Sequence, residues 1–160
     1  MDPTLLAYIG PGLAEGLAAI GTSLGIEAAI SAGTPVIAED PSQRGKIFAL
    51  AFFPMTQTLI YGMVYMFVMY MIVLPSLLSA HNGMIPFDKA GAVFGISLFV
   101  GFAELFSAYM QGRACASTAA NLIKTRGGIM GTGIVLASYE ELVGILGMVF
   151  GLAMVFLIVG

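Results

Sequence analysis

Residues 53–64 read FPMTQTLIYGMV, and residues 138–149 read SYEELVGILGMV. Each stretch opens an apolar run long enough to cross a membrane, and alignment of the two places Glu141 opposite Thr56. Polar side chains at membrane depth are energetically expensive, and they usually serve function, most often an ion path. A carboxylate in one stretch, matched by Thr and Gln in the other, therefore predicts an ion-binding site inside a membrane.

The composition excludes an ordinary soluble domain. The chain is 59% hydrophobic and 9% charged, whereas about a quarter of the residues of a typical globular domain are charged. Its 160 residues leave room for a single membrane domain, residues 1–160. The lone Cys115 excludes a disulfide framework within the chain, and the scarcity of charge argues against nucleic acid as a partner. No basic stretch precedes the first apolar run, so we expect no cleaved signal peptide.

Four hydrophobic segments each exceed the roughly 20 residues that span a bilayer core. They comprise residues 5–32, 47–78, 90–123 and 129–160. The breaks between them contain polar residues, glycine or proline, and they cover residues 34–44, 79–88 and 124–128. Backbone groups in lipid must be satisfied internally, which helices achieve. We therefore predict an all-α polytopic membrane protein whose four transmembrane helices form two tandem hairpins.

Basic residues predict how the chain is oriented. Five of the six flank the first and third breaks, namely Arg44, Lys46, Arg113, Lys124 and Arg126. Only Lys89 belongs to the middle break, which also contains His81. The positive-inside rule then places both hairpin loops in the cytoplasm, with the two termini and the His81 loop outside.

The two halves of the chain resemble each other. The GMV of residues 62–64 recurs at residues 147–149, and residues 12–19 resemble residues 101–108. The two offsets, 85 and 89 residues, are reconciled by a difference in loop length. A repeat of this kind predicts that the second hairpin is a copy of the first.

We expect the repeat to consist of residues 1–80 and 88–160. Both copies begin on the same side of the membrane, so the repeat is parallel, unlike the inverted repeats of many transporters. The first segment carries glycines at spacings that let helix backbones approach closely in lipid; these are Gly10, Gly12, Gly16, Gly21 and Gly25. Such a helix suits the inner wall of a ring built from copies of the chain.

Taken together, these features resemble the proteolipid (c- or K-type) subunit of V-type rotary ATPases, in its sodium-binding form. The most specific motifs are residues 53–57 with Tyr61-Gly62, residues 105–113, and Glu141 followed by Gly147. The resemblance implies a non-catalytic subunit of a membrane rotor ring that carries ions during rotation coupled to ATP hydrolysis. The chain also contains no phosphate-binding Gly-Lys-Ser/Thr loop, in agreement with that role.

The resemblance also implies an ion-binding site with five contributions. These are the Glu141 carboxylate, the amide oxygens of Gln57 and Gln111, the Thr56 hydroxyl and the Phe53 carbonyl, which Pro54 would partly free. A hard monovalent cation favours several neutral oxygens with one negative charge. A proton needs only the carboxylate, so this set favours Na⁺, with H⁺ as the alternative.

Two features complicate the choice of ligands. The tyrosine that bonds the glutamate in the family falls four residues after the threonine, whereas Tyr61 lies five residues after Thr56. Glu140 and Glu141 are adjacent; the spacing to Gly147 selects Glu141, and Glu140 on the glycine-rich face is the alternative carboxylate.

Glu15 and Glu104 are equivalent in the repeat and stand at membrane depth, where the family pattern has no carboxylate. We expect them to line a wet or lipid-filled ring interior or to bond across helices, in preference to a second ion path.

The implied partners are identical copies in a ring, a stator membrane subunit with half-channels, a central-stalk subunit and the lipids of a prokaryotic cell membrane. Two other classes are weaker. A channel-forming or structural four-helix protein lacks support because no continuous polar stripe follows the segments. A secondary transporter is disfavoured by the parallel repeat and the small size.

Overall fold

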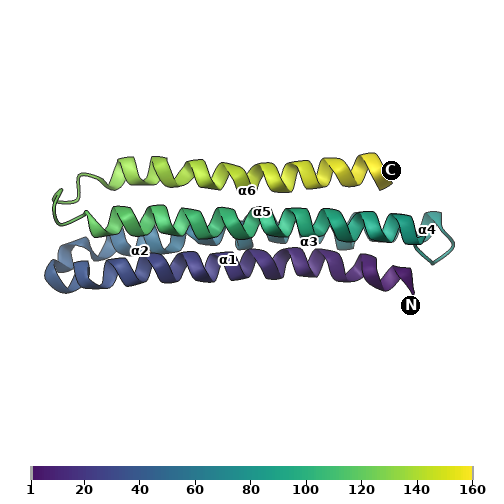
Figure 1. The fold of residues 1–160 in the computed structure, drawn as a ribbon, viewed down its shortest axis with the longest axis horizontal. Coiled ribbons are helices and arrows are strands. Elements are labelled where there is room, and N and C mark those ends of the chain that lie inside the picture. Colours follow the sequence, from purple (N-terminus) through teal and green to yellow (C-terminus); the bar gives the residue numbers. More distant parts are fainter. Residues whose placement is uncertain (1, 160) are drawn as a thin grey trace.

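The computed structural model describes residues 2–159, and it shows long antiparallel helices with both ends of the chain at one end of the bundle (Figure 1). Within this range, four helical stretches are long and apolar enough to cross a membrane, and no strand occurs. These spans are Pro3–Glu39, Pro41–Ala80, Phe87–Ala120 and Met130–Ile158. The predicted all-α fold with four transmembrane helices is confirmed.

Three of the spans are single helices: α1 (Pro3–Glu39), α5 (Phe87–Ala120) and α6 (Met130–Val159). The second span is divided. In order, it consists of η1 (Pro41–Gln43), α2 (Arg44–Phe52), η2 (Phe53–Met55), η3 (Gln57–Gly62), α3 (Met63–Val68), η4 (Met69–Val73) and α4 (Leu74–Ala80). Of these, η1 and η2 are 3₁₀ turns, whereas η3 and η4 are wider π-helical turns.

The first helix extends further than the sequence predicted. We expected it to end at Ala32, but α1 continues through Pro35 to Glu39. Asp40 leaves the helix, because a residue that precedes proline disfavours the α conformation, and Asp40 is extended (φ −135°, ψ 93°) before Pro41. The Asp40 carboxylate then accepts hydrogen bonds from the Ser42 N–H at 3.0 Å and from Gln43 Nε2 at 2.9 Å. These bonds, that of Gln43 first, hold the pKa of Asp40 below its usual value.

The interior is centred on the contact between α1 and α5. A Cβ added at Gly101 of α5 would lie 2.8 Å from Ala14 Cα of α1, and one added at Gly21 would lie 2.6 Å from Leu105 Cα. Backbones this close require small residues at the crossing, as expected for helix pairs in lipid. The second span packs against both α1 and α5, and α6 packs mainly against α5. Gly144, Gly147 and Gly151 of α6 are buried as one face.

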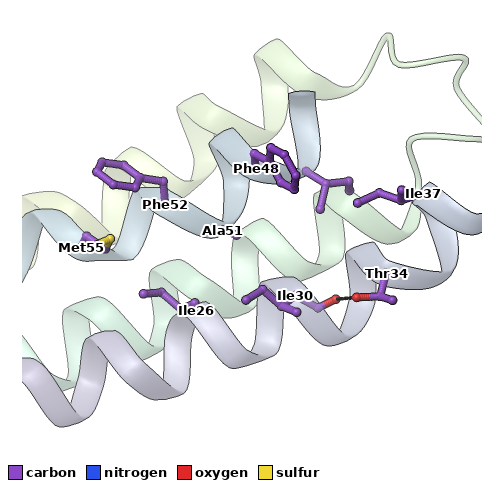
Figure 2. Close-up of a pocket in the computed structure, with 9 residues that line it drawn as sticks. Ile26, Ile30, Thr34, Ile37, Phe48, Ala51, Phe52 and Met55 are labelled. Carbon is purple, nitrogen blue, oxygen red and sulfur yellow. Dashed lines mark hydrogen bonds between the residues drawn. The ribbon is translucent and has the colours of Figure 1, made fainter. Parts of the chain in front are cut away.

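The outer surface is apolar over most of its length. An open groove of about 400 Å³ lies between α1 and the second span (Figure 2). Its walls are aliphatic and aromatic side chains, among them Ile26, Ile30, Phe48 and Phe52. The one hydroxyl at this groove, that of Thr34, donates to the Ile30 carbonyl at 2.8 Å. A surface of this kind suits lipid or another membrane helix.

Candidate ion-binding site

The second span departs from α-helical geometry where the predicted ligands lie. Pro54 has no N–H to donate, so it cannot continue the regular bonding pattern, and the chain forms the 3₁₀ turn η2 around it. The Phe53 carbonyl accepts the Thr56 N–H, and the Thr56 hydroxyl lies 3.2 Å away from it. Pro54 thus distorts the helix as expected, but the Phe53 carbonyl is not left free, because it accepts hydrogen bonds from Thr56.

A chain of hydrogen bonds joins three spans at this level. The Thr56 hydroxyl also lies 3.1 Å from Gln57 Oε1, so its single hydrogen can serve only one of its two neighbouring acceptors at a time. Gln57 Nε2 donates to Ser107 Oγ of α5 at 3.0 Å. Ser107 Oγ donates to the backbone carbonyl of Glu140 in α6 at 2.6 Å. The second span, α5 and α6 are therefore held in register by polar contacts.

The side-chain oxygen of Gln111 has no hydrogen-bond partner within residues 2–159. Its side chain is 0% exposed, and Nε2 donates to the Ala137 carbonyl at 3.4 Å, one turn before Glu141. Its Oε1 atom is buried without a hydrogen bond to any of residues 2–159. An unsatisfied buried acceptor costs about 1–3 kcal/mol. The Gln111 amide is therefore well suited to accept a cation.

Tyr61 contacts the predicted carboxylate in spite of its unexpected spacing. The Tyr61 hydroxyl donates to Glu141 Oε1 at 3.0 Å. The π-helical turn η3 (Gln57–Gly62) begins directly after Thr56 and includes Tyr61, and such a turn takes up about one residue more than an α-helical turn. The extra residue between Thr56 and Tyr61 is thereby absorbed, and the tyrosine faces α6.

The structure also separates the two adjacent glutamates. Both side chains are half-buried, but the carboxylate bonded to Tyr61 is that of Glu141, whereas Glu140 meets α5 through its backbone carbonyl. The predicted ligands fall into two bonded groups, the first made of Phe53, Thr56 and Gln57, and the second of Tyr61 and Glu141. Gln111 lies between α5 and α6 and bonds to neither group.

The expectation for Glu104 is wrong. The side chain neither lines an open interior nor bonds across helices, because it is 0% exposed and neither carboxylate oxygen has a partner in the described part of the chain. The close crossing of α1 and α5 brings the surrounding helices over this face of α5. Sequence periodicity marks Glu104 as a residue at membrane depth, but it does not reveal how completely the neighbouring helices cover it.

With this geometry established, comparison with known proteins identifies the family. The family model that describes the C subunit of ATP synthase matches the chain twice, over residues 9–69 and 94–154. The chain belongs to the ATP synthase C-subunit family. One match lies in each predicted copy of the hairpin, and members of this family are non-catalytic membrane subunits.

A curated relative gives a second comparison. The chain is similar to the A-type ATP synthase subunit K of Methanocaldococcus jannaschii, with 39% identity over 62 residues. The alignment covers 39% of this chain and 28% of the relative, so it spans less than a third of that protein.

Proposed function

We propose that this chain is the rotor-ring subunit of an A/V-type ATP synthase and carries Na⁺ on Glu141. The observation that carries the proposal is the Tyr61–Glu141 hydrogen bond of 3.0 Å, which places the carboxylate beside the distorted segment of the second span. Membership of the ATP synthase C-subunit family supports the rotor role. The chain would bind and release ions and would hydrolyse no ATP itself.

Neutralisation of Glu141 would allow the site to face lipid. An isolated charge in the middle of a bilayer is costly, whereas a carboxylate paired with a cation is much less so. An ion would enter from one half-channel of a stator subunit, travel with the ring and leave through the other half-channel. The free energy for this movement would come through a central-stalk subunit attached to the ring.

The neutral oxygens near Glu141 favour Na⁺ over H⁺. Thr56, Gln57 and Gln111 offer three neutral oxygen atoms near the level of the carboxylate, and the oxygen of Gln111 has no partner within residues 2–159. The Phe53 carbonyl would join this set once the Thr56 hydroxyl turns towards Gln57, since Thr56 lies within hydrogen-bonding distance of both. Hard cations prefer oxygen ligands of this kind, whereas a proton requires only Glu141.

The exposed side chains of the subunit indicate what would surround it in the ring. Exposed aliphatic and aromatic side chains cover the spans, so identical copies and membrane lipids would surround each subunit. We place the ring in a prokaryotic cell membrane, with both termini outside and the two hairpin loops in the cytoplasm, where the basic residues gather.

Carbodiimide labelling of Glu141 in purified rings tests the proposal. The reagent attacks a protonated carboxyl group, so bound Na⁺ should protect Glu141 at fixed pH, and Glu141→Gln should abolish the labelling. Glu140→Gln is the matched control and should leave Na⁺ protection unchanged. Labelling of Glu141 that ignores NaCl but falls as the pH rises would identify H⁺ as the coupling ion. Protected labelling at Glu140 would move the site to that residue.

A further inference from the structure

A second pair of carboxylates lies in the interior of the subunit, beside the hydrogen bond from Gln57 to Ser107. Glu104 is 0% exposed, and both of its oxygen atoms lack a hydrogen-bond partner among residues 2–159. Glu15 is half-buried, and its Oε2 atom is buried without a partner in the same range. Carboxylate oxygens buried in this way are costly, and they require a ligand or a proton.

The two glutamates flank the same crossing of α1 and α5. Ala14, which precedes Glu15, touches Gly101, and Gly101 lies one turn before Glu104. Both carboxylates lie beside Gln57. A Cβ added at Gly62 would meet Glu15 Oε2 and the Gln57 carbonyl, and one added at Gly144 would meet Glu104 Oε2 and the Gln57 side chain. Glu15 and Glu104 therefore form one cluster and are not two isolated carboxylates.

Glycines of the other two spans leave room for this cluster. A Cβ added at Gly144 of α6 would lie 2.8 Å from Glu104 Oε2 and 3.0 Å from Ser107 Oγ. A Cβ added at Gly62 would collide with Glu15 Oε2. Each carboxylate thus occupies space that a side chain larger than glycine at Gly62 or Gly144 would fill.

No basic residue is available to neutralise the pair. The nearest along α5 is Arg113, which lies nine residues beyond Glu104, or about 13 Å along the helix. No Lys or Arg lies within two helical turns of Glu15 in the sequence. The missing positive charge must come from outside the chain.

We propose that Glu15 and Glu104 form a second binding site for a monovalent cation inside the subunit, next to the site at Glu141. Both oxygens of Glu104, the buried oxygen of Glu15 and the adjacent Ser107 hydroxyl are its ligands. A single cation satisfies the three unpartnered carboxylate oxygens together. The half-buried Glu15 connects this site to the surface of the subunit, and the site does not require Glu141 to carry ions.

Equilibrium binding of radioactive Na⁺ to intact purified rings tests this proposal. The wild-type ring should bind two Na⁺ per chain. Glu141→Gln should retain one Na⁺ per chain, Glu104→Gln should also lose one, and the double variant should bind none. Glu15→Gln, which keeps Glu104, should weaken the retained site about tenfold or more when combined with Glu141→Gln, since it removes a charged ligand. Glu27→Gln alters an exposed glutamate of α1 and should change nothing.

The variants distinguish the failure of this proposal from failure of the rotor proposal. If Glu141 carries H⁺, the wild-type ring should bind one Na⁺ per chain, and that ion should disappear in Glu104→Gln but remain in Glu141→Gln. If all Na⁺ binding disappears in Glu141→Gln, or if Glu104→Gln leaves the number bound unchanged, the second site is overturned. Should Glu104→Gln prevent ring assembly, the number of Na⁺ bound per chain in Glu141→Gln rings alone decides whether the second site exists.

Discussion

The two hairpins differ most in the span that follows each loop. In the first hairpin this span is interrupted by a 3₁₀ turn and two π-helical turns, and it carries the neutral oxygens of Thr56 and Gln57. In the second hairpin α6 is one unbroken helix from Met130 to Val159, and it carries Glu141. The comparison indicates that duplication allowed these two spans to specialise, the first in backbone distortion and neutral ligands and α6 in charge.

The largest effect on ion transport should come from removing the negative charge of Glu141 in the second hairpin. Glu141→Gln keeps the shape of the side chain but cannot neutralise a cation, so we expect loss of Na⁺ transport and of Na⁺-coupled ATP hydrolysis in the reconstituted complex. The ring should still assemble, which gel filtration and electron microscopy would show. Glu140→Gln should retain transport. If both variants pump ions, the division of labour between the hairpins is wrong and so is the rotor proposal.

The neutral ligands should matter less than the charge. Gln57→Ala or Gln111→Ala should each weaken Na⁺ binding to Glu141 by about 1–3 kcal/mol, the usual range for a lost buried polar partner. The concentration of NaCl that protects Glu141 from carbodiimide measures this change. Asn121→Ala, which alters the amide at the C-cap of α5, the helix that carries Gln111, is the control. Equal protection in wild type and both glutamine variants would exclude these amides from the site.

The packing of Glu104 against Gly144 of the unbroken helix α6 gives a third test. Gly144→Ala would place a methyl group 2.8 Å from Glu104 Oε2 and 3.0 Å from Ser107 Oγ, and overpacking of this kind costs about 1–3 kcal/mol. Gly131→Ala lies in the same helix and meets no atom within 4 Å, so it should stabilise the helix slightly. The temperature at which rings dissociate should fall for the first variant and not for the second. The opposite order would contradict the buried position of Glu104.

A smaller effect should follow from loss of the hydrogen bond between Tyr61 and Glu141, one of those that join the two hairpins. Tyr61→Phe removes only the hydroxyl that donates to Glu141, so Na⁺ binding should weaken by about 1 kcal/mol. Deletion of Ile60 offers a sharper test of the π-helical turn. Ile60 is 48% exposed, and its removal should convert the π turn into an α turn while Tyr61 still reaches Glu141. A deletion variant with the Na⁺ affinity of Tyr61→Phe would show that the π turn does not set this register.

The smallest effect should be confined to the loop of the first hairpin. The pKa of Asp40 is lowered by hydrogen bonds from Gln43 and Ser42, so the charged form stabilises this turn. That stabilisation is present above the pKa of an unfolded aspartate, about 3.9, and it is lost as the pH falls through the lowered value. Asp40→Ala should speed hydrogen exchange at Ser42 at neutral pH and leave Na⁺ binding intact. Unchanged exchange would mean that the loop does not depend on this cap.

The sequence predicted the number of spans for physical reasons, and the ligand set at Glu141 stays a prediction. Length and hydropathy identify membrane helices because a bilayer fixes the required apolar length. The end of α1 was placed too early because Pro35 was treated as part of a break, although a proline can remain inside a transmembrane helix. The pair Asp40-Pro41 contained the correct signal, since the residue before a proline tends to leave the helix.

Other features depended on three-dimensional contacts. The spacing from Thr56 to Tyr61 signalled an extra residue, but only the backbone shows that a π-helical turn absorbs it. The spacing to Gly147 favours Glu141 over Glu140 in the sequence, whereas the hydrogen bond from Tyr61 to Glu141 is visible only in the structure. The burial of Glu104 depends on how closely α1 and α5 approach, which is decided jointly by residues distant in the sequence such as Ala14 and Gly101.

The glycine-lined crossing of α1 and α5 also has a geometric consequence. Two helices that meet backbone to backbone, as at Gly21 and Gly101, make that side of the subunit thin. In the proposed ring each subunit would then be wedge-shaped, with its narrow side towards the centre of the ring. The angle of that taper would set the curvature of the ring and hence how many copies close the circle. A bulkier residue at Gly21 or Gly101 would thus alter the circumference of the rotor without touching an ion ligand.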